Sequence, residues 1–185
     1  MDSFVKKLKS SPRTLFGTWV KLSTFETMQM LAQSGFDFVV IDAEHSPLSL
    51  ETIYNLTAFA QSLGMSVLVR IPDQATNDIQ RLLDIGVDGL LVPRVRNKAE
   101  AKNSIDKMIF SPKGTRGLGI TSRAGMWGQK TLDEYVQYGN EEILRCIQLE
   151  DKEVLENMDE VLDVDGVNAA FIGMGDLTMT TGLPP

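Results

Sequence analysis

Cysteine and histidine are nearly absent from this sequence of 185 residues, which contains one of each. A single cysteine, Cys146, excludes an internal disulfide, and its place in the apolar run ILRCIQL is typical of a buried core thiol. Basic residues are also few, with 18 Lys and Arg against 25 Asp and Glu and a net charge of -7. Because nucleic-acid binding usually requires a cationic surface, this balance argues against a DNA or RNA partner.

Long apolar segments are missing as well. No run approaches the roughly 20 residues that cross a bilayer, and the first residues, MDSFVKKLKSSPRT, lack the apolar centre of a signal peptide. We therefore expect a cytoplasmic protein without a membrane partner. Its composition, 43% hydrophobic and 23% charged, is typical of a single globular domain, here residues 1–185.

The segments that are present alternate regularly. Apolar runs rich in Val, Ile, Leu and Phe are separated by stretches of helical periodicity, which is typical of parallel strands joined by crossover helices. Strands are predicted at residues 15–22, 37–43, 66–71, 88–93, 142–149 and 168–173. Helices are predicted at residues 2–9, 24–34, 48–63, 75–85, 97–108 and 153–163. The similar passages QSGFDFVV, QSLGMSVLV and DIGVDGLLV indicate successive units of a (β/α) barrel.

The alternation lapses between residues 110 and 141, which are rich in glycine and contain Arg116, Arg123 and Trp127. Connections this long in compact domains are usually functional or disordered. One interpretation is a flexible surface excursion. The other, which the basic and aromatic side chains favour, is an active-site loop that folds over the mouth of the barrel.

Polar residues gather where the predicted strands end, which is where parallel α/β folds form their active sites. These residues are Asp42, Glu44, His45, Arg70, Gln148, Glu150 and, after the sixth strand, Asp176. The only histidine, His45, suits acid–base chemistry near neutral pH, although a lone histidine is more often structural. A base needs an orienting partner, and Asp84 is a candidate whose position also fits a solvated carboxylate at a helix end.

Arg70 and the pair of Glu150 and Asp176 have more than one interpretation. Arg70 either pairs with an internal carboxylate or binds a substrate carboxylate through its planar guanidinium. Glu150 and Asp176 lie one β/α unit apart and can face the same point, as ligands of a hard divalent cation such as Mg²⁺ or Mn²⁺ do. Alternatively, Glu150 is an acid favoured by a helix N-terminus.

Six stretches in order carry a family resemblance: FDFVVIDAEHSPLSLE, SVLVRIP, RLLDIGVDGLLVPRV, SPKGTRG with the later SRAG, IQLEDKEVLEN and FIGMGDLTMTTG. They resemble the HpcH/HpaI family of metal-dependent class II pyruvate aldolases, 4-hydroxy-2-oxoheptanedioate aldolase among them. The resemblance implies a (β/α)8 TIM barrel, of which about six β/α units are present here. It also implies cleavage of 4-hydroxy-2-oxo acids, in aromatic compound catabolism, to pyruvate and an aldehyde through an enolate stabilised by Mg²⁺, Mn²⁺ or Co²⁺.

Through the resemblance, five residues gain roles in the chemistry. His45 is implied as the base with Asp84 as its partner, and Arg70 as the residue that binds the pyruvate carboxylate and steadies the enolate. Glu150 and Asp176 are implied as the metal ligands. No lysine Schiff base is needed.

Four further residues are implied at the substrate. Gln148 and Gly175 would lie beside the bound oxo acid, Trp19 would shape the aldehyde pocket, and Asp42 would contribute near the aldehyde site across a subunit interface. The sequence departs from the family where Met174 and Gly175 precede Asp176, since many relatives have Pro followed by Asn or Ala there.

The resemblance implies a homo-oligomer, a trimer or hexamer, and a barrel that needs roughly two more β/α units than this sequence contains. Missing residues, a fragment or closure by another chain would each account for the difference. Two other functions stay open: a citrate-lyase-like acyl-CoA lyase, which a basic patch for CoA would favour, and a non-catalytic remnant that binds a metabolite.

Overall fold

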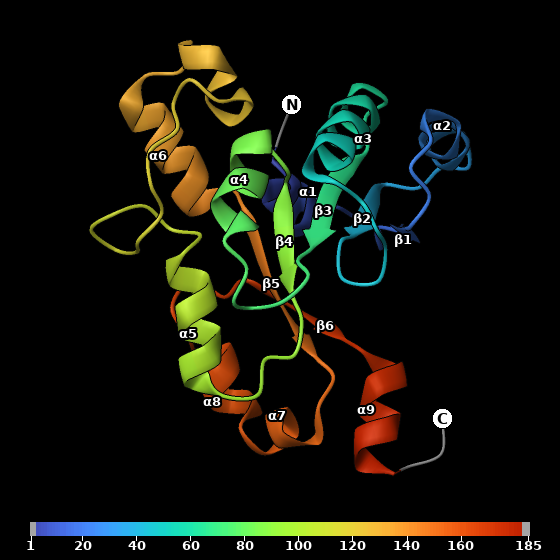
Figure 1. The fold of residues 1–185 in the computed structure, drawn as a ribbon, viewed down its shortest axis with the longest axis vertical. Coiled ribbons are helices and arrows are strands. Elements are labelled where there is room, and N and C mark those ends of the chain that lie inside the picture. Colours follow the sequence, from blue (N-terminus) through green and yellow to red (C-terminus); the bar gives the residue numbers. More distant parts are fainter. Residues whose placement is uncertain (1–2, 183–185) are drawn as a thin grey trace.

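The computed structural model describes residues 3–182, which form one sheet of six parallel strands in the order β1-β2-β3-β4-β5-β6, with helices between them (Figure 1). The strands are β1 Gly17–Val20, β2 Phe38–Asp42, β3 Ser66–Arg70, β4 Gly89–Val92, β5 Leu144–Leu149 and β6 Ala169–Ile172. Each lies within its predicted range. Within the described residues β1 and β6 are not neighbours in the sheet, so the fold is a partial barrel.

The helices run between the strands and at both ends of the described chain. They are α1 Phe4–Ser10, α2 Phe25–Gln33, α3 Leu50–Ser62, α4 Asp78–Ile85, α5 Lys98–Asp106, the 3-10 helix η1 Arg123–Gly128, α6 Leu132–Glu141, α7 Lys152–Glu156, α8 Met158–Leu162 and α9 Met174–Thr181. Four of the predicted helices, at 24–34, 48–63, 75–85 and 97–108, are confirmed. The helix predicted at 2–9 begins at Phe4, and residue 2 lies outside the described residues.

Two predictions about helices were wrong. The single helix predicted at 153–163 is two short helices, because Asn157, at φ -113 and ψ 13, interrupts the helical backbone between α7 and α8. The segment 110–141 is not one long loop, because it contains η1 and α6. Thr131 and Glu134 start α6 with a capping box, in which each side chain accepts a hydrogen bond from the other residue's backbone N–H.

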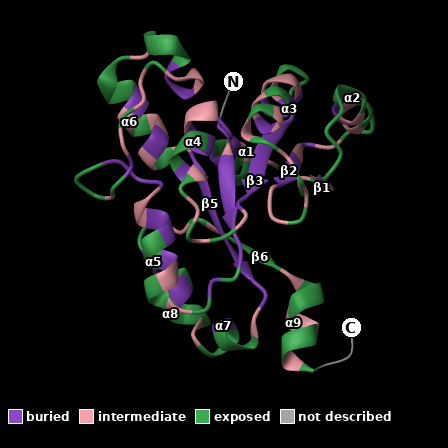
Figure 2. Cartoon of the chain, in the orientation of Figure 1, coloured by how far each residue is buried: buried purple, intermediate pink, exposed green. Residues whose placement is uncertain are grey.

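The sheet has an apolar layer on each face. Val39 and Ile41 of β2 pack with the surrounding helices, whereas Val40 faces a separate cluster inside the curved sheet. Helix α1 contributes Phe4 to this inner cluster, and its ring lies 5.1 Å from that of Phe38. Buried residues are therefore concentrated in the central strands (Figure 2). Among the described residues, no helix has the length and apolar character needed to cross a membrane.

Candidate active site

A cavity of ≈ 510 Å³ lies at the carboxyl ends of the strands. Its lining includes six residues that the sequence predicted for the site: Trp19, His45, Arg70, Gln148, Gly175 and Asp176. They come from β1, β3, β5, the turn after β2 and the start of α9. Segments far apart in the sequence therefore converge where a parallel β/α fold places its active site.

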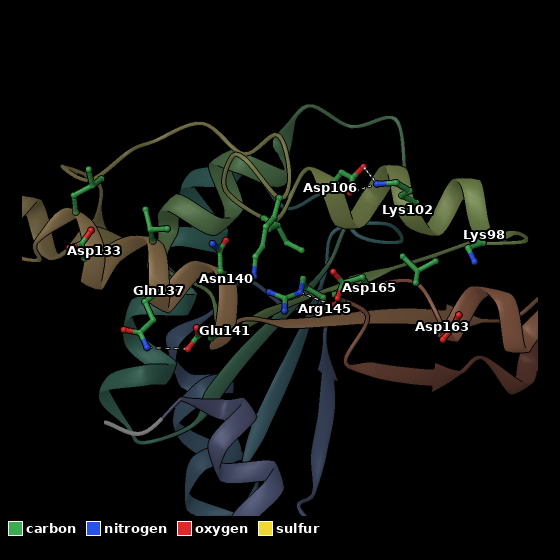
Figure 3. Close-up of a pocket in the computed structure, with 16 residues that line it drawn as sticks. Lys98, Lys102, Asp106, Asp133, Gln137, Asn140, Glu141, Arg145, Asp163 and Asp165 are labelled. Carbon is green, nitrogen blue, oxygen red and sulfur yellow. Dashed lines mark hydrogen bonds and ion pairs between the residues drawn. The ribbon is translucent and has the colours of Figure 1, made fainter.

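A larger cavity of ≈ 740 Å³ lies elsewhere, lined by residues of α5, α6 and the turn after α8 (Figure 3). None of the predicted site residues lines it. Its buried cation, Arg145, donates hydrogen bonds to the carbonyls of Gly166 at 2.6 Å and Gly139 at 3.4 Å. Since Arg145 lies near the start of β5, this cavity is at the amino ends of the strands. We therefore assign the candidate site to the smaller cavity, because the predicted site residues line it and it lies at the carboxyl ends of the strands.

Arg70 is the last residue of β3 and is held by carboxylates within the same chain. The parallel register places it beside Asp42, and its Nε and Nη2 donate to the two carboxylate oxygens at 3.0 and 2.7 Å. Its Nη1 lies 3.3 Å from Oε2 of Glu44, and its guanidinium lies 4.3 Å from the ring centroid of Trp19. Arg70 thus has an internal partner and still lines the cavity.

Asp42 is held by several polar groups of its own chain, and its contribution near the aldehyde site across a subunit interface stays a prediction. It is fully buried, and besides Arg70 its Oδ1 accepts the backbone N–H groups of Glu44 and His45, each at 3.1 Å, while Lys21 Nζ lies 3.2 Å from Oδ2. Burial alone would raise the pKa of Asp42, but these hydrogen bonds and charges lower it to about 2. Within this chain Asp42 fastens Arg70 and the turn that carries His45.

We expect Asp42→Asn to destabilise the fold by about 3 kcal/mol at neutral pH, because the buried Arg70 loses its bidentate charge partner and keeps only the longer contact with Glu44. The pKa of Asp42 is lowered to about 2. Its carboxylate therefore stabilises the native state above about pH 4, and this contribution is lost as the pH falls toward 2. Urea unfolding at pH 7 and pH 3 measures both effects. An equal loss of stability on acidification in the wild type and the variant would contradict the account, and exposed Glu26→Gln is the control.

His45 lies in the turn after β2, with its side chain 48% exposed and its Nε2 3.6 Å from Oε2 of Glu44. The expected partner Asp84 is elsewhere in the chain. It accepts hydrogen bonds from Arg116 Nη2 and from the hydroxyl of Tyr135, both at 3.1 Å. Helices run antiparallel to the strands they follow, so the last turn of α4 puts Asp84 at the amino ends of the strands. Within residues 3–182 no hydrogen bond or ion pair joins Asp84 to His45.

The segment 110–141 is also placed at the amino ends of the strands rather than over the cavity. Arg123 of η1 donates to the carbonyl of Ile85 at 2.9 Å and to Oε1 of Gln61 at 2.7 Å. Both acceptors belong to the last turns of α3 and α4. Within one chain this segment therefore does not cover the mouth of the partial barrel.

Glu150 follows β5 directly and is buried. Its Oε1 accepts the backbone N–H of Arg94 at 2.6 Å, and its Oε2 accepts a hydrogen bond from Gln148 Nε2. Burial raises the pKa of Glu150, and the negative charges of Glu44 and Asp176 raise it further, against the hydrogen bond from Arg94. The carboxylates thus lie close enough to repel one another, and a cation between them would relieve this repulsion.

Several features of the site fit a hydrated divalent cation. Among residues 3–182 no three His, Cys, Asp or Glu side chains form a metal-binding cluster. Glu150 and Asp176 would therefore be two ligands of the cation, and water or substrate oxygens would be the others, as hard cations allow. Two buried acceptors at the site, Oε2 of Glu44 and Oε1 of Gln148, have no hydrogen-bond partner in the protein. Buried acceptors of this kind are usually satisfied by water or by a ligand.

Gly173 gives Glu150 and Gln148 the room they occupy. A Cβ at this position would lie 2.8 Å from Glu150 Cβ and 3.0 Å from Gln148 Nε2. We expect Gly173→Ala to displace both side chains and to weaken divalent-cation binding by roughly tenfold, as loss of supporting contacts to metal ligands does. Manganese titration followed by electron paramagnetic resonance measures this. Gly175→Ala is the matched control, because nothing lies within 4 Å of its added Cβ, and equal losses in the two variants would contradict the steric reason.

Sequence reasoning gave no role to several residues that the structure brings to the site: Lys21, Glu44, Arg94 and Phe171. The signal for Lys21, Glu44 and Arg94 was available, because each lies within two residues of the end of a strand. Phe171 sits in β6, where its ring meets Trp19 edge to face at 5.5 Å. This contact joins the first and last strands across the cavity and depends on the curvature of the sheet.

Parallel β/α units with a polar cavity at the strand ends define the chain as a protein of the TIM-barrel class with an enzyme-like site. The chain belongs to the HpcH/HpaI aldolase/citrate lyase family, whose pattern matches residues 15–184. This family and its aldolase relatives indicate a lyase.

Two aldolases are among the relatives of this chain. A 4-hydroxy-2-oxo-heptane-1,7-dioate aldolase of Escherichia coli is 34% identical over 182 residues, which cover 98% of this chain and 68% of the relative. A 2-keto-3-deoxy-L-rhamnonate aldolase of Salmonella gallinarum is 32% identical over 172 residues, covering 92% of this chain and 64% of the relative.

Solved structures share the fold. The crystal structure of an HpcH/HpaI aldolase from Desulfitobacterium hafniense has a TM-score of 0.88 and 32% identity, covering 98% of this chain and 70% of that one. The citrate synthase SbnG has a TM-score of 0.87 and 26% identity, covering 98% of this chain and 69% of that one. Proteins similar to this chain therefore include more than one carbon–carbon chemistry.

Proposed function

We propose that this chain is a metal-dependent aldolase that cleaves 4-hydroxy-2-oxo acids to pyruvate and an aldehyde. The observation that carries the proposal is the meeting of Arg70, His45 and Asp176 in one cavity, with the buried carboxylate of Glu150 hydrogen-bonded to Gln148 in the cavity lining. The aldolases named among the relatives support the same reaction class. Glu150 and Asp176 would hold Mg²⁺, Mn²⁺ or Co²⁺. When bound, such a cation supplies positive charge to the oxygen on which the enolate charge develops.

The side chains around the cavity have complementary tasks in this reaction. Arg70, fixed by Asp42 and stacked on Trp19, lines the cavity, where its guanidinium would bind the carboxylate of the oxo acid. Gln148 lines the cavity and would lie beside the bound oxo acid. His45 accepts the proton of the C4 hydroxyl as the C3–C4 bond breaks, which releases the aldehyde and leaves the electron pair on the enolate. Protonation of C3 then gives pyruvate.

The small oxo acid is favoured over an acyl-CoA by the charges of the cavity. A CoA substrate needs cationic side chains for its phosphates, whereas the basic residues that line the cavity are Lys21 and Arg70. Both already contact Asp42. The citrate-lyase-like alternative therefore lacks the basic patch that would support it at this cavity.

The test is an aldol assay with pyruvate and a short aldehyde in the presence of Mg²⁺, Mn²⁺ or Co²⁺. We expect product to form with cation, to stop when EDTA is added, and to return when cation is restored. Activity that survives complete chelation would contradict the metal assignment. Condensation of an acyl-CoA instead of pyruvate would replace this proposal with the citrate-lyase-like one.

A further inference from the structure

Glu44 is a buried carboxylate that the proposed reaction leaves without a task. Its side chain is 5% exposed, and its Oε1 lies 3.0 Å from Nη2 of Arg94. Its Oε2 lies 3.3 Å from Nη1 of Arg70 and 3.6 Å from Nε2 of His45, yet it has no hydrogen-bond partner within the protein. An ionised carboxylate can only accept hydrogen bonds, so this oxygen, beside two residues that line the cavity, can still accept one from a further donor.

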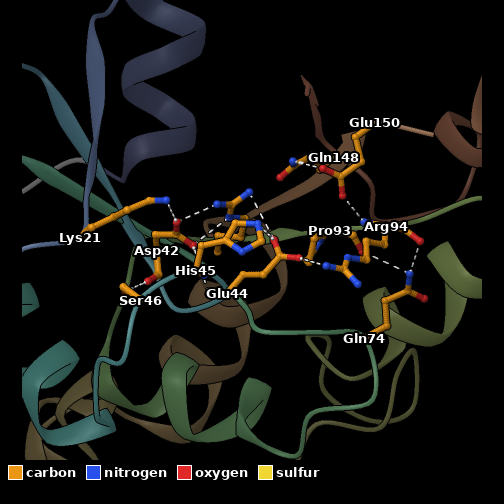
Figure 4. A network of polar contacts seen from close by, with 11 residues as sticks. Lys21, Asp42, Glu44, His45, Ser46, Gln74, Pro93, Arg94, Gln148 and Glu150 are labelled. Carbon is orange, nitrogen blue, oxygen red and sulfur yellow. Dashed lines mark hydrogen bonds and ion pairs between the residues drawn. The ribbon is translucent and has the colours of Figure 1, made fainter. Parts of the chain in front are cut away.

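Arg94 holds Glu44 and Glu150 at the same time (Figure 4). Its guanidinium contacts Glu44, and its backbone N–H donates to Oε1 of Glu150 at 2.6 Å. Arg94 has a positive φ of 57, a conformation that non-glycine residues adopt rarely and mostly at functional sites. The side chain of Gln74 stabilises this backbone, because its Nε2 donates a hydrogen bond to the carbonyl of Arg94 at 2.6 Å. Arg94 is therefore held in this conformation and contacts both Glu44 and Glu150.

The charges around the cavity are consistent with a bound cation. Four carboxylates and three basic side chains line the cavity or are linked to its lining residues: Asp42, Glu44, Glu150 and Asp176 with Lys21, Arg70 and Arg94. One negative charge is left over when His45 is neutral. A divalent cation together with a singly charged oxo acid would bring the total to zero. Without the oxo acid, water fills the free positions of such a cation and supplies the missing donor.

We propose that Oε2 of Glu44 accepts a hydrogen bond from a water ligand of the cation held by Glu150 and Asp176. Arg94 is the positioning residue that holds Glu44 and Glu150 in place for this arrangement. The inference rests on the proposed function, because it requires the cation. It assigns Glu44 and Arg94 to cation binding, although neither contacts the cation.

Two variants separate positioning from simple charge. Arg94→Gly keeps the backbone N–H and tolerates the positive φ, but it removes the guanidinium. A purely electrostatic effect predicts tighter cation binding after loss of a positive charge, whereas positioning predicts weaker binding. Glu44→Asp keeps the charge but withdraws the carboxylate by one methylene. If Glu44 acted through its charge alone, cation binding would be unchanged in Glu44→Asp. If its position matters, cation binding would again be weaker.

The measurement is the dissociation constant of Mn²⁺, from electron paramagnetic resonance of the free ion, on the full chain without substrate. We expect weakening by roughly tenfold in both variants, within the range found when supporting contacts to metal ligands are lost. Arg96→Gly is the matched control, because Arg96 is a nearby exposed arginine whose Nε contacts Asp151 at 3.2 Å. It should stay within about twofold of the wild type.

The outcomes are distinguishable. Tighter or unchanged Mn²⁺ binding in Arg94→Gly, or unchanged binding in Glu44→Asp, would overturn the inference and leave the aldolase proposal standing. Failure of the wild type to bind Mn²⁺ would overturn the metal-dependent function and the inference with it. If Arg94→Gly does not fold, by circular dichroism, Glu44→Asp decides.

Discussion

Replacing Glu150 with alanine is expected to lower kcat/KM of the aldol reaction by about a thousandfold, the scale on which loss of a main charge-stabilising element acts. The variant removes one of the two proposed cation ligands. It also leaves the backbone N–H of Arg94 and Nε2 of Gln148 without the carboxylate that accepts their hydrogen bonds. Steady-state assays with saturating cation measure the loss, and Mn²⁺ titration should show that binding fails at the same time.

Glu156→Ala makes the same substitution at an exposed position in the nearby helix α7 and serves as the control. It should leave both the activity and the Mn²⁺ affinity close to those of the wild type. Activity in Glu150→Ala within tenfold of the wild type, measured on folded protein, would show that Glu150 is not a cation ligand.

His45→Ala is expected to reduce kcat by about 10²- to 10⁴-fold, the usual contribution of general acid–base catalysis. Binding of pyruvate and of the cation should stay nearly intact. His45 is half exposed and only approaches Glu44, at 3.6 Å, so its removal breaks no buried contact. Because the chain has no other histidine, no second imidazole can take over the proton transfer.

Stopped-flow assays give kcat for this variant, and calorimetric titration gives the affinity for pyruvate in the presence of cation. Added imidazole should restore part of the rate, since the vacated space opens into the cavity. If pyruvate binding collapsed while turnover of the bound fraction persisted, the acid–base role of His45 would be wrong.

The strands and the position of the site could be predicted because both follow from the same physical rule. Runs such as VVI in β2 and VLV in β3 are apolar without alternation, as in sheets covered on both faces. Parallel strands end at one edge, so His45 and Arg70, far apart in sequence, had to lie near each other. The cavity that contains both follows from this polarity.

The capping box of α6 was visible in the sequence as Thr131 followed by Glu134, yet the glycine-rich surroundings favoured a loop. The location of Asp84 could also have been anticipated. A helix that returns from the carboxyl edge of the sheet ends at the amino edge, which separates Asp84 from His45 within one chain.

Other features of the site left no mark in the sequence. The positive φ of Arg94 is not signalled by residue type, because glycine or asparagine is usual in that conformation. The unpartnered oxygen of Glu44 likewise depends on distances of a few ångströms between side chains from three strand ends. Pattern and periodicity do not determine such distances.

This cavity is expected to form a cation-stabilised enolate of pyruvate, and proton exchange at the pyruvate methyl group tests this without any knowledge of the aldehyde. Pyruvate is incubated in D₂O with the protein and Mn²⁺ or Mg²⁺, and samples are taken at intervals. The cation is removed from each sample, and the remaining methyl protons are then measured by nuclear magnetic resonance. We predict deuterium exchange that requires the cation, stops with EDTA and is lost in Glu150→Ala. Exchange that continues after complete chelation, or its absence from folded protein that binds the cation, would contradict this account.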